Sequence, residues 1–375
     1  MDLLRVLTDS ADNHHYQLNI FHGQRNACFT QRGLAHQVPT ITQPAVTLER
    51  GEGFDIIHTF NLVPLRPRVR FIVTFEDVAP RIWDDPRHGK IRESLVRRLA
   101  SRHCIRLVAM SQYAVRVFER QHSKDTRFGV LKGKICQIYP SIHDVQPQLN
   151  LPIKHTLRLL FVGRDFMRKG LPAVTRTHAG LLALGIPVHT TVVSSLNWLG
   201  DEYIAPCDDY DLESERNLLN QPGIEHIPSA SHNEVLTLMS RAHFTLLPTL
   251  HDTFGYSVIE SLACGTPVIA TATCAMPELI EEGINGFLIP LCVDGHFLEW
   301  QGMQYRQEPN YYDYYRTTID ELSTRLVERL SQFWETRADY SRLRDGAANV
   351  FETRFSPLHA RRKLEELYEE SMYSA

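Results

Sequence analysis

Short runs of apolar and β-branched residues alternate with longer amphipathic stretches along most of the chain. In the first half, the runs that predict strands are 3–8, 54–60, 70–75, 105–111 and 134–140. Between several of them lie stretches with helical periodicity, most clearly at 90–103. This alternation is typical of an α/β domain built on a parallel sheet.

The pattern stops at 144–156, "DVQPQLNLPIKHT", which contains two prolines and no periodicity and therefore predicts a linker. It then restarts, with predicted strands at 157–163, 187–195, 243–249 and 266–272 and predicted helices at 171–185, 231–242 and 256–264. We expect two Rossmann-like, doubly wound α/β domains, covering 1–150 and 151–355.

Two segments near the end do not follow the alternation. Residues 295–320 are aromatic and polar with little periodicity, so we interpret them as an insertion. Residues 354–373, "RFSPLHARRKLEELYEESMY", predict an amphipathic helix that starts near Ser356 or Pro357. We assign 356–375 to the first domain.

Composition narrows the class of protein. The 375 residues are 43% apolar and 22% charged, which is typical of a soluble globular protein. No apolar run is long enough for a membrane-spanning helix, and the N-terminus does not resemble a secretory signal. The seven cysteines are scattered without a CxxC pair, which favours free thiols in a cytoplasmic protein over a zinc site.

The net charge of −4 is unevenly distributed. Residues 1–150 carry 21 basic and 14 acidic residues, whereas the remainder carries 19 basic and 30 acidic residues. A basic half joined to an acidic half indicates two domains with different partners.

One candidate site follows the strand in "LLFVGRDFMRKGL". The strand ends at Gly163, and Arg164 and Lys169 follow within six residues. Strand ends of doubly wound sheets open onto the ligand crevice, where two cations can hold a diphosphate. The alternative is a solvated loop with surface charges, which this stretch alone favours.

A second candidate is "HDTFGYSVIESLACGTPVIAT", which predicts a buried strand end, a loop and a helix. Amides at Phe254, Gly255 and Tyr256 would lie at the helix N-terminus, an anion site. Glu260 can accept hydrogen bonds from a ribose diol, and Asp252 can reach sugar hydroxyls. Alternatively, Asp252 caps the helix and Glu260 pairs with an arginine.

Together these motifs resemble the donor site of the family-four retaining glycosyltransferases, over about 157–290. That signature is a carboxylate, seven residues, a glutamate, a helix and GxPVIA, preceded by a strand-Gly-Arg…Lys-Gly motif. Asp252 stands where the family usually has a glutamate, which shortens the reach and keeps the charge. The donor-binding residues that the resemblance implies are Gly163, Arg164, Lys169, Asp252, Thr253, Phe254, Gly255, Tyr256 and Glu260.

The resemblance implies the GT-B fold, with two domains facing a central cleft and a last helix crossing back to the first. It implies transfer of a sugar from a UDP- or GDP-sugar to an unknown acceptor, with retention and without a metal or cofactor. Arg164, Lys169, Asp252 and Glu76 are the implied catalytic residues. Cations and helix amides would stabilise the leaving diphosphate.

The first half resembles the family more weakly. The usual glycine pair after the first strand is missing, Phe60 replaces a histidine, and Glu76 stands where an active-site histidine is common. Either Glu76 takes over sugar contacts, the domain binds something unusual, or the protein is a catalytically silent relative. Acceptor-side candidates are His58, Glu76 and Asp77, although a core role for His58 is slightly favoured.

The remaining candidates have simpler interpretations. Ser111 predicts a helix cap. The segment 90–106 predicts a cationic helix that could lie on an anionic membrane, although a surface helix packed on the sheet is favoured. A nucleic-acid partner is disfavoured, as is a nucleotide-sugar epimerase. Asp84–Asp85 and Asp208–Asp209 are expected to be solvated charges rather than metal ligands.

Overall fold

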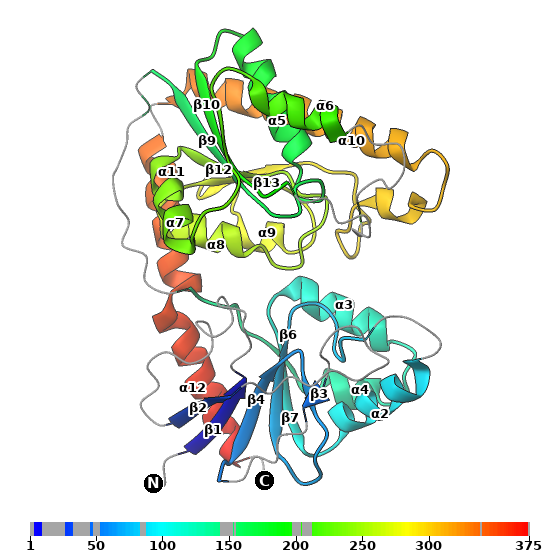
Figure 1. Cartoon of the computed structure of the whole chain (residues 1–375). Coiled ribbons are helices and arrows are strands. Elements are labelled where there is room, and N and C mark those ends of the chain that lie inside the picture. Colours follow the sequence, from blue (N-terminus) through cyan, green and yellow to red (C-terminus); the bar gives the residue numbers. More distant parts are fainter. Residues whose placement is uncertain are drawn as a thin grey trace. The chain divides into compact units, whose positions relative to one another are not determined.

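The chain forms two compact α/β units (Figure 1). The computed structural model describes residues 4–9, 27–32, 46–47, 53–82, 88–142, 153, 155–196, 204, 212–337 and 340–373. The first unit contains Met1–His143 and Arg354–Ala375, and the second contains Asp144–Thr353. The first boundary lies seven residues before the one placed from the sequence at 150, and the predicted linker lies mostly outside the described residues.

The first unit is built on a six-stranded parallel sheet. Its strand order is β2 (Ala27–Arg32), β1 (Leu4–Asp9), β4 (Ile56–Phe60), β6 (Phe71–Phe75), β7 (Cys104–Ala109) and β8 (Ile135–Gln137). A short parallel pair joins β3 (Val46–Thr47) to β5 (Val63–Pro64). Its helices are α2 (Gly89–Ala100), α3 (Gln112–His122), α4 (Phe128–Lys132) and α12 (Pro357–Tyr373).

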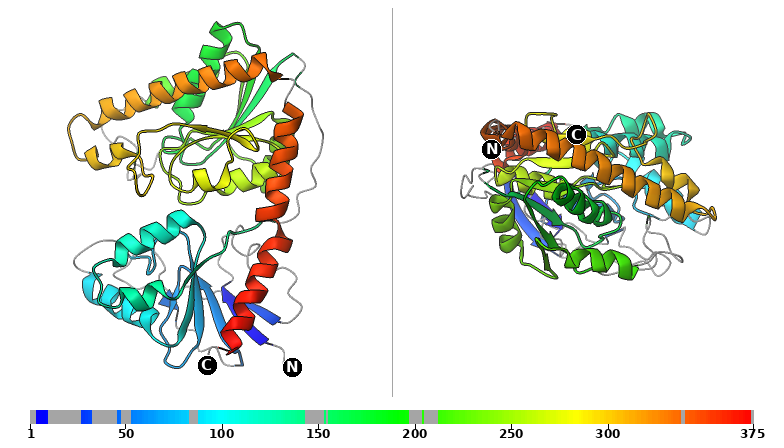
Figure 2. Two further views of the ribbon diagram at one scale, coloured as in Figure 1. Left: turned by 180° about the vertical axis from the view of Figure 1, so that it is seen from behind. Right: turned by 90° about the horizontal axis from the view of Figure 1, so that it is seen from above.

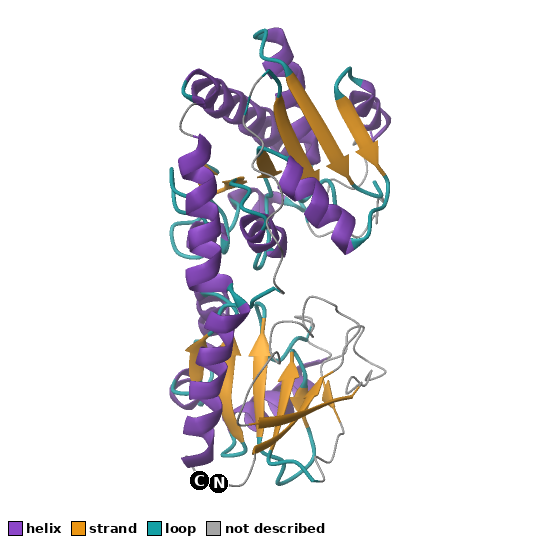
Figure 3. Ribbon diagram, turned by 90° about the vertical axis from the view of Figure 1, so that its left-hand side faces the viewer, coloured by secondary structure: helices purple, strands orange, loops and turns teal. Residues whose placement is uncertain are grey.

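The last helix, α12, belongs to the first unit and lies beside its sheet (Figure 3). Tyr368 donates from its hydroxyl toward His58 Nδ1 on β4 at 2.5 Å. Arg70 Nη2 donates to the Ser371 carbonyl oxygen, also at 2.5 Å. The amphipathic pattern of 354–373 is therefore explained by a helix that covers the start of the chain.

The second unit has a six-stranded parallel sheet whose strand order reverses beside its first strand. The order is β11 (Ile224–Ile227), β10 (Val188–Val193), β9 (Leu157–Val162), β12 (Phe244–Leu247), β13 (Val268–Thr271) and β14 (Gly286–Ile289). The chain builds outward from β9 to β11 and then crosses to β12 on the other side of β9. Ligand sites of doubly wound sheets lie at such a reversal, outside the carboxyl ends of the strands.

Helices cover both faces of this sheet (Figure 2). Successive residues of β9 alternate between the faces: Leu159 and Phe161 join one core cluster and Leu160 another. The helices are α5 (Leu171–Ala183), α6 (Leu212–Asn217), α7 (His232–Arg241), α8 (Tyr256–Ala263), α9 (Met276–Leu279), α10 (Tyr311–Glu335) and α11 (Tyr340–Val350), with 3-10 turns η2 (Leu218–Asn220) and η3 (Gln301–Tyr305) and a π-helical turn η5 (Phe351–Phe355). Of these, α5 and α10 pack together, as do α7 and α8.

Two sequence predictions were wrong in detail. The segment 90–106 is not one helix, because α2 ends at Ala100 and β7 begins at Cys104, where every residue of the strand except Arg106 is buried. The interpretation of 295–320 as an aperiodic insertion fails from Tyr311 onward, where α10 begins. Tyr311 and Tyr315 are buried on its core face, so counting tyrosine as polar hid the helical period.

Gly170 allows the loop after β9 to touch the end of β12. Its backbone φ is +83°, and a Cβ atom there would lie 2.0 Å from the Pro248 carbonyl oxygen. Both the left-handed conformation and the close approach require glycine. Pro248, which follows β12, is thereby held against Gly170, the N-cap residue of α5.

We expect Gly170→Ala to destabilise the protein far more than Gly185→Ala, a matched control. Gly185 has φ of +72° but open space around its Cα, so alanine there costs only the conformational strain, about 1–2 kcal/mol. Gly170→Ala adds a backbone clash, worth about 2 kcal/mol or more. Urea unfolding of both variants measures the difference, and equal losses would show that the two loops separate without cost.

Candidate functional site

The loops that follow β9 and β12 are joined by hydrogen bonds at the reversal of strand order. The Arg168 carbonyl oxygen accepts from the Leu250 amide at 2.9 Å and from Thr249 Oγ1 at 3.1 Å. The Arg168 guanidinium donates from Nη1 to the His251 carbonyl oxygen at 2.6 Å. These bonds fix the residues on either side, Lys169 and Asp252, next to each other.

Lys169 and Asp252 form an ion pair at this junction, with Nζ donating to Oδ2. Asp252 is buried, with 7% of its surface exposed. Burial opposes its ionisation, but the charges of Lys169 and Arg168 outweigh burial, and the pKa of Asp252 falls below its usual value. Asp252 is therefore a carboxylate held by cations.

The helix α8 begins beside this pair. Gly255 is its N-cap, with φ of +91°, so Asp252 does not cap the helix as the alternative interpretation required. A Cβ atom on Gly255 would lie 2.5 Å from Met276 Cε, the end of a flexible side chain, so it is the left-handed φ that favours glycine here. Phe254 is fully buried, and its ring lies 5.3 Å from that of Tyr256. The packed aromatic residue positions the first turn, whose amides have no acceptor within a helix.

Glu260 lies one turn into α8 and is 5% exposed. Burial raises its pKa to about 8, against the opposing charge of Lys169. At neutral pH its carboxyl group therefore holds a proton, unlike Asp252. The charge of Lys169 lowers the pKa of both Asp252 and Glu260, so this cation lies within electrostatic reach of both carboxyl groups.

A histidine lies close to Glu260, and the pairing of Glu260 with an arginine stays an alternative. Nδ1 of His232 lies 3.6 Å from Oε1 of Glu260, too far for a normal hydrogen bond. His232 is the first residue of α7, which Ser231 and Glu234 start with a capping box. The capping-box spacing predicts where α7 starts, but no local pattern indicates that His232 reaches Glu260, so the sequence analysis missed it.

The other predicted donor residues follow β9. A Cβ atom on Gly163 would lie 3.1 Å from Cγ of Lys169, so this glycine leaves room for the lysine stem. Arg164 is exposed at the same strand end. Thr253 is half-buried in the loop that follows β12. Gly163 therefore lies against Lys169, which in turn pairs with Asp252.

His58, an acceptor-side candidate, is a core residue. It is 1% exposed, and its Nε2 lies 2.8 Å from Thr74 Oγ1 while Nδ1 contacts the Tyr368 hydroxyl. Burial lowers the pKa of His58 to about 3, so its ring is neutral. Because both nitrogens are bonded inside the fold, the acceptor-side role is withdrawn for His58.

Glu76 and Asp77 follow β6 and are half-buried. Oε2 of Glu76 lies 3.9 Å from the Arg81 guanidinium, and Oδ1 of Asp77 accepts from the Val78 amide at 2.6 Å. The predicted acceptor contacts of both stay predictions. Ser111 caps α3 by accepting from the Ala114 amide at 2.9 Å, as predicted.

The basic residues of α2 are largely bonded to the protein. Arg98 donates from Nε to the Pro64 carbonyl oxygen at 2.7 Å and lies over the Phe71 ring. Glu93 binds Arg97 at 3.2 Å and Arg127 at 2.7 Å. These contacts favour the interpretation of α2 as a surface helix packed on its own sheet. Among the described helices, none combines the length and apolar character needed to cross a membrane.

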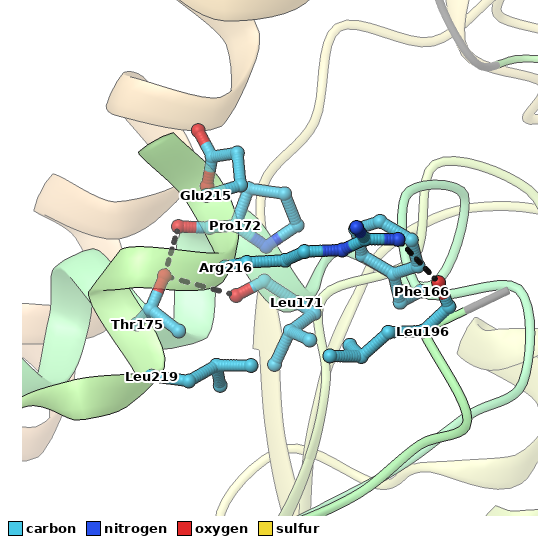
Figure 4. Close-up of a pocket in the computed structure, with 8 residues that line it drawn as sticks. All are labelled: Phe166, Leu171, Pro172, Thr175, Leu196, Glu215, Arg216 and Leu219. Carbon is cyan, nitrogen blue, oxygen red and sulfur yellow. Dashed lines mark hydrogen bonds between the residues drawn. The ribbon is translucent and has the colours of Figure 1, made fainter. Parts of the chain in front are cut away.

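Two further features lie apart from this site. A surface hollow between α5 and α6 is lined by Phe166, Leu171, Arg216 and others (Figure 4). It encloses no space large enough for a water molecule and therefore offers no small-molecule site. The described residues contain no cluster of three metal-binding side chains, and both aspartate pairs, 84–85 and 208–209, lie outside the described residues.

Comparison with solved structures identifies the fold. A glycosyltransferase from Rickettsia africae is 15% identical with a TM-score of 0.57, and each chain is covered completely. Anabaena Alr3699/HepE, solved in complex with UDP, is 14% identical with a TM-score of 0.60, over 98% of this chain and 100% of the other. The two α/β units have the GT-B fold.

Sequence comparison adds a match within the second unit. Residues 150–296 match the family model for glycosyl transferases group 1. D-inositol 3-phosphate glycosyltransferases of Thermobifida fusca and Mycobacterium tuberculosis are 31% and 28% identical to 45% and 38% of this chain. The matches span 40% and 28% of those relatives, well under half of their length.

We expect Lys169→Met to lower the free energy of unfolding by about 3–5 kcal/mol, because it leaves the buried Asp252 carboxylate without its cation. The double variant Lys169→Met/Asp252→Asn should lose less than the two single variants added together. Arg97→Met, which breaks an exposed pair, should change stability by less than about 1 kcal/mol. Additive losses at 169 and 252 in urea unfolding would contradict the pairing.

We expect the stability of the protein to fall as the pH rises through the neutral range because of Glu260. Its folded pKa of about 8 exceeds the unfolded value, so between about pH 5 and pH 8 the folded state holds a proton that the unfolded state releases. The loss is at most about 1.4 kcal/mol per pH unit.

Glu260→Gln removes this titration, so its free energy of unfolding minus that of the unchanged protein should grow from pH 5 to pH 8. Glu335→Gln, at an exposed position, is the control and should give a difference independent of pH. A constant difference for Glu260→Gln would mean that the carboxyl group is ionised in the fold.

Proposed function

We propose that the protein transfers a sugar from a UDP- or GDP-sugar to an acceptor, with retention of configuration and without a metal ion. The observation that carries this proposal is the Lys169–Asp252 pair next to Glu260, at the strand reversal of the second unit. The cation of Lys169 suits the diphosphate of such a donor. The ionised Asp252 suits hydroxyl groups of the sugar, and the protonated Glu260 suits the ribose.

The diphosphate would bind Arg164, Lys169 and the amides that begin α8. Lys169 has three N–H donors, so it can hold Asp252 and a phosphate oxygen together. Arg164 is exposed and can turn its planar guanidinium toward two oxygens. The N-terminus of α8 adds backbone donors that are fixed before the donor arrives. Donors fixed in this way stabilise the negative charge that develops on the leaving phosphate.

Glu260 would bind the ribose diol as a neutral acid. A protonated carboxyl group donates one hydrogen bond and accepts others, so it can satisfy two neighbouring hydroxyl groups at once. A neutral acid also avoids placing a second negative charge near the diphosphate. Asp252, which stays ionised, would accept hydrogen bonds from hydroxyl groups of the transferred sugar.

In the transfer step, the bond between the sugar carbon and the diphosphate oxygen breaks as the acceptor hydroxyl forms a bond on the same face. The leaving diphosphate oxygen takes the acceptor proton, so atoms and charge balance without a strong base. Glu76 and Asp77, the remaining acceptor-side candidates, would orient the acceptor. The proposal includes no membrane contact through α2, since Arg97 and Arg98 of this helix are bonded within the first unit.

The structural relatives support the donor class. Alr3699/HepE was solved with UDP and with UDP-glucose, and the second structure has a TM-score of 0.59 to this chain. A second candidate function is donor binding without turnover, which the replacement of an active-site histidine by Glu76 favours. The intact residues of the second unit favour an enzyme.

We expect the protein to release nucleoside diphosphate from at least one sugar nucleotide in a panel of UDP- and GDP-sugars, slowly without an acceptor. Lys169→Ala should reduce this rate by about a hundredfold or more, because one electrostatic donor contributes that much in comparable sites. Arg164→Ala should raise the donor KM, whereas Arg241→Ala, at an exposed position of α7, should match the unchanged protein. Thermal stabilisation by UDP or GDP without turnover would favour the binding protein, and neither response would reject both functions.

A further inference from the structure

A groove of about 480 Å³ lies between α10 and the chain that follows β14. Leu291 and Cys292 form one side, and Asp313, Tyr314, Thr317 and Glu321 are among the residues of α10 that form the other. The volume falls within the range of small-molecule sites. None of the residues discussed so far as donor-binding lines it.

The groove exists because α10 has two different faces. Tyr315, Ile319 and Leu326 are buried in the core of the second unit. On the groove side, Asp313, Thr317 and Glu321 recur every four residues, so they lie above one another on the helix surface. These three side chains are exposed at the groove and offer hydrogen-bonding groups to a polar ligand.

An aromatic wall supports the groove. The ring of Tyr314 lies 6.0 Å from that of the buried Trp300 and 5.1 Å from that of Tyr305. The returning chain is fixed by the Gln301 amide, which donates to the Cys292 carbonyl oxygen at 3.0 Å. The wall is therefore built before any ligand binds.

The lining favours a neutral ligand with several hydroxyl groups. Asp313 and Glu321 are acceptors, and Thr317 both donates and accepts. Arg325, which lines the groove, donates to the Pro290 carbonyl oxygen at 2.6 Å and lies 3.4 Å from Glu321, while Asp313 lies 3.4 Å from Arg316. Both acids of the lining thus have a basic partner, which favours a neutral ligand over an ion. The ring of Tyr314 and the side chain of Leu291 offer apolar surface for the C–H face of a sugar.

The groove opens at the same edge of the sheet as the Lys169–Asp252 pair. Leu291 and Cys292 follow the carboxyl end of β14, which is two strands from β12. Neighbouring strands are about 4.8 Å apart, so the ends of β12 and β14 are separated along the edge by about 10 Å. We propose that the groove between α10 and residues 291–292 binds a sugar residue of a neutral glycan, beside the donor site and independently of the proposed transfer.

The exposed Cys292 thiol, which lines the groove, provides the test. The rate of its alkylation by iodoacetamide is measured by mass spectrometry with neutral trisaccharides of glucose, galactose, mannose and N-acetylglucosamine. We expect at least one trisaccharide to slow alkylation by about tenfold at ten times its dissociation constant, because bound protein is protected.

Thr317→Arg, which fills the groove, should abolish the protection, and Thr324→Arg, at an exposed position on the same helix outside the groove, should retain it. Protection by none of the trisaccharides, or equal protection of both variants, would overturn the inference. Thermal stabilisation by UDP or GDP is measured on the unchanged protein and on Thr317→Arg. If neither is stabilised, the donor site is rejected, and the groove is still decided separately by the alkylation of Cys292.

Discussion

The site depends on a set of short hydrogen bonds that tie two loops together at the point where the strand order reverses. Arg168 contributes both its carbonyl oxygen and its guanidinium, and Gly170 removes the side chain that would keep the loops apart. A buried aspartate is costly alone, and it becomes acceptable when the backbone holds the half-buried Lys169 in contact with it. The Lys169–Asp252 pair therefore follows from the backbone bonds, and the start of α8 is fixed by the same loop.

Two acids that belong to the same site differ in charge because their surroundings differ. Asp252 lies on a loop next to two cations, which lower its pKa despite burial. Glu260 is packed within α8, where burial dominates and raises its pKa to about 8. Separating the pKa values of neighbouring acids is a general way to give them different tasks. Here it would provide one acceptor for sugar hydroxyl groups and one group that both donates and accepts.

The sequence predicted the parts of the structure that local patterns determine. The strands of the second unit, the helices that follow them and the cap at Ser111 come from apolar periodicity and capping residues. Local patterns do not show which segments, far apart in the sequence, come into contact. The contact between His232 and Glu260 joins two helices, the bonds of His58 join β4 to α12, and the core face of α10 consists partly of tyrosines. Each depends on tertiary packing, which overrides the local signal.

Glu260 gives a physical reason to regard the pocket as a ligand site. A carboxyl group with a folded pKa of about 8 weakens the fold at neutral pH, compared with a glutamine of similar shape. Costs of this kind persist where a group serves binding or catalysis. A bound diol would add hydrogen bonds to this buried carboxyl group, so Glu260 would contribute to donor binding at a position where it destabilises the fold.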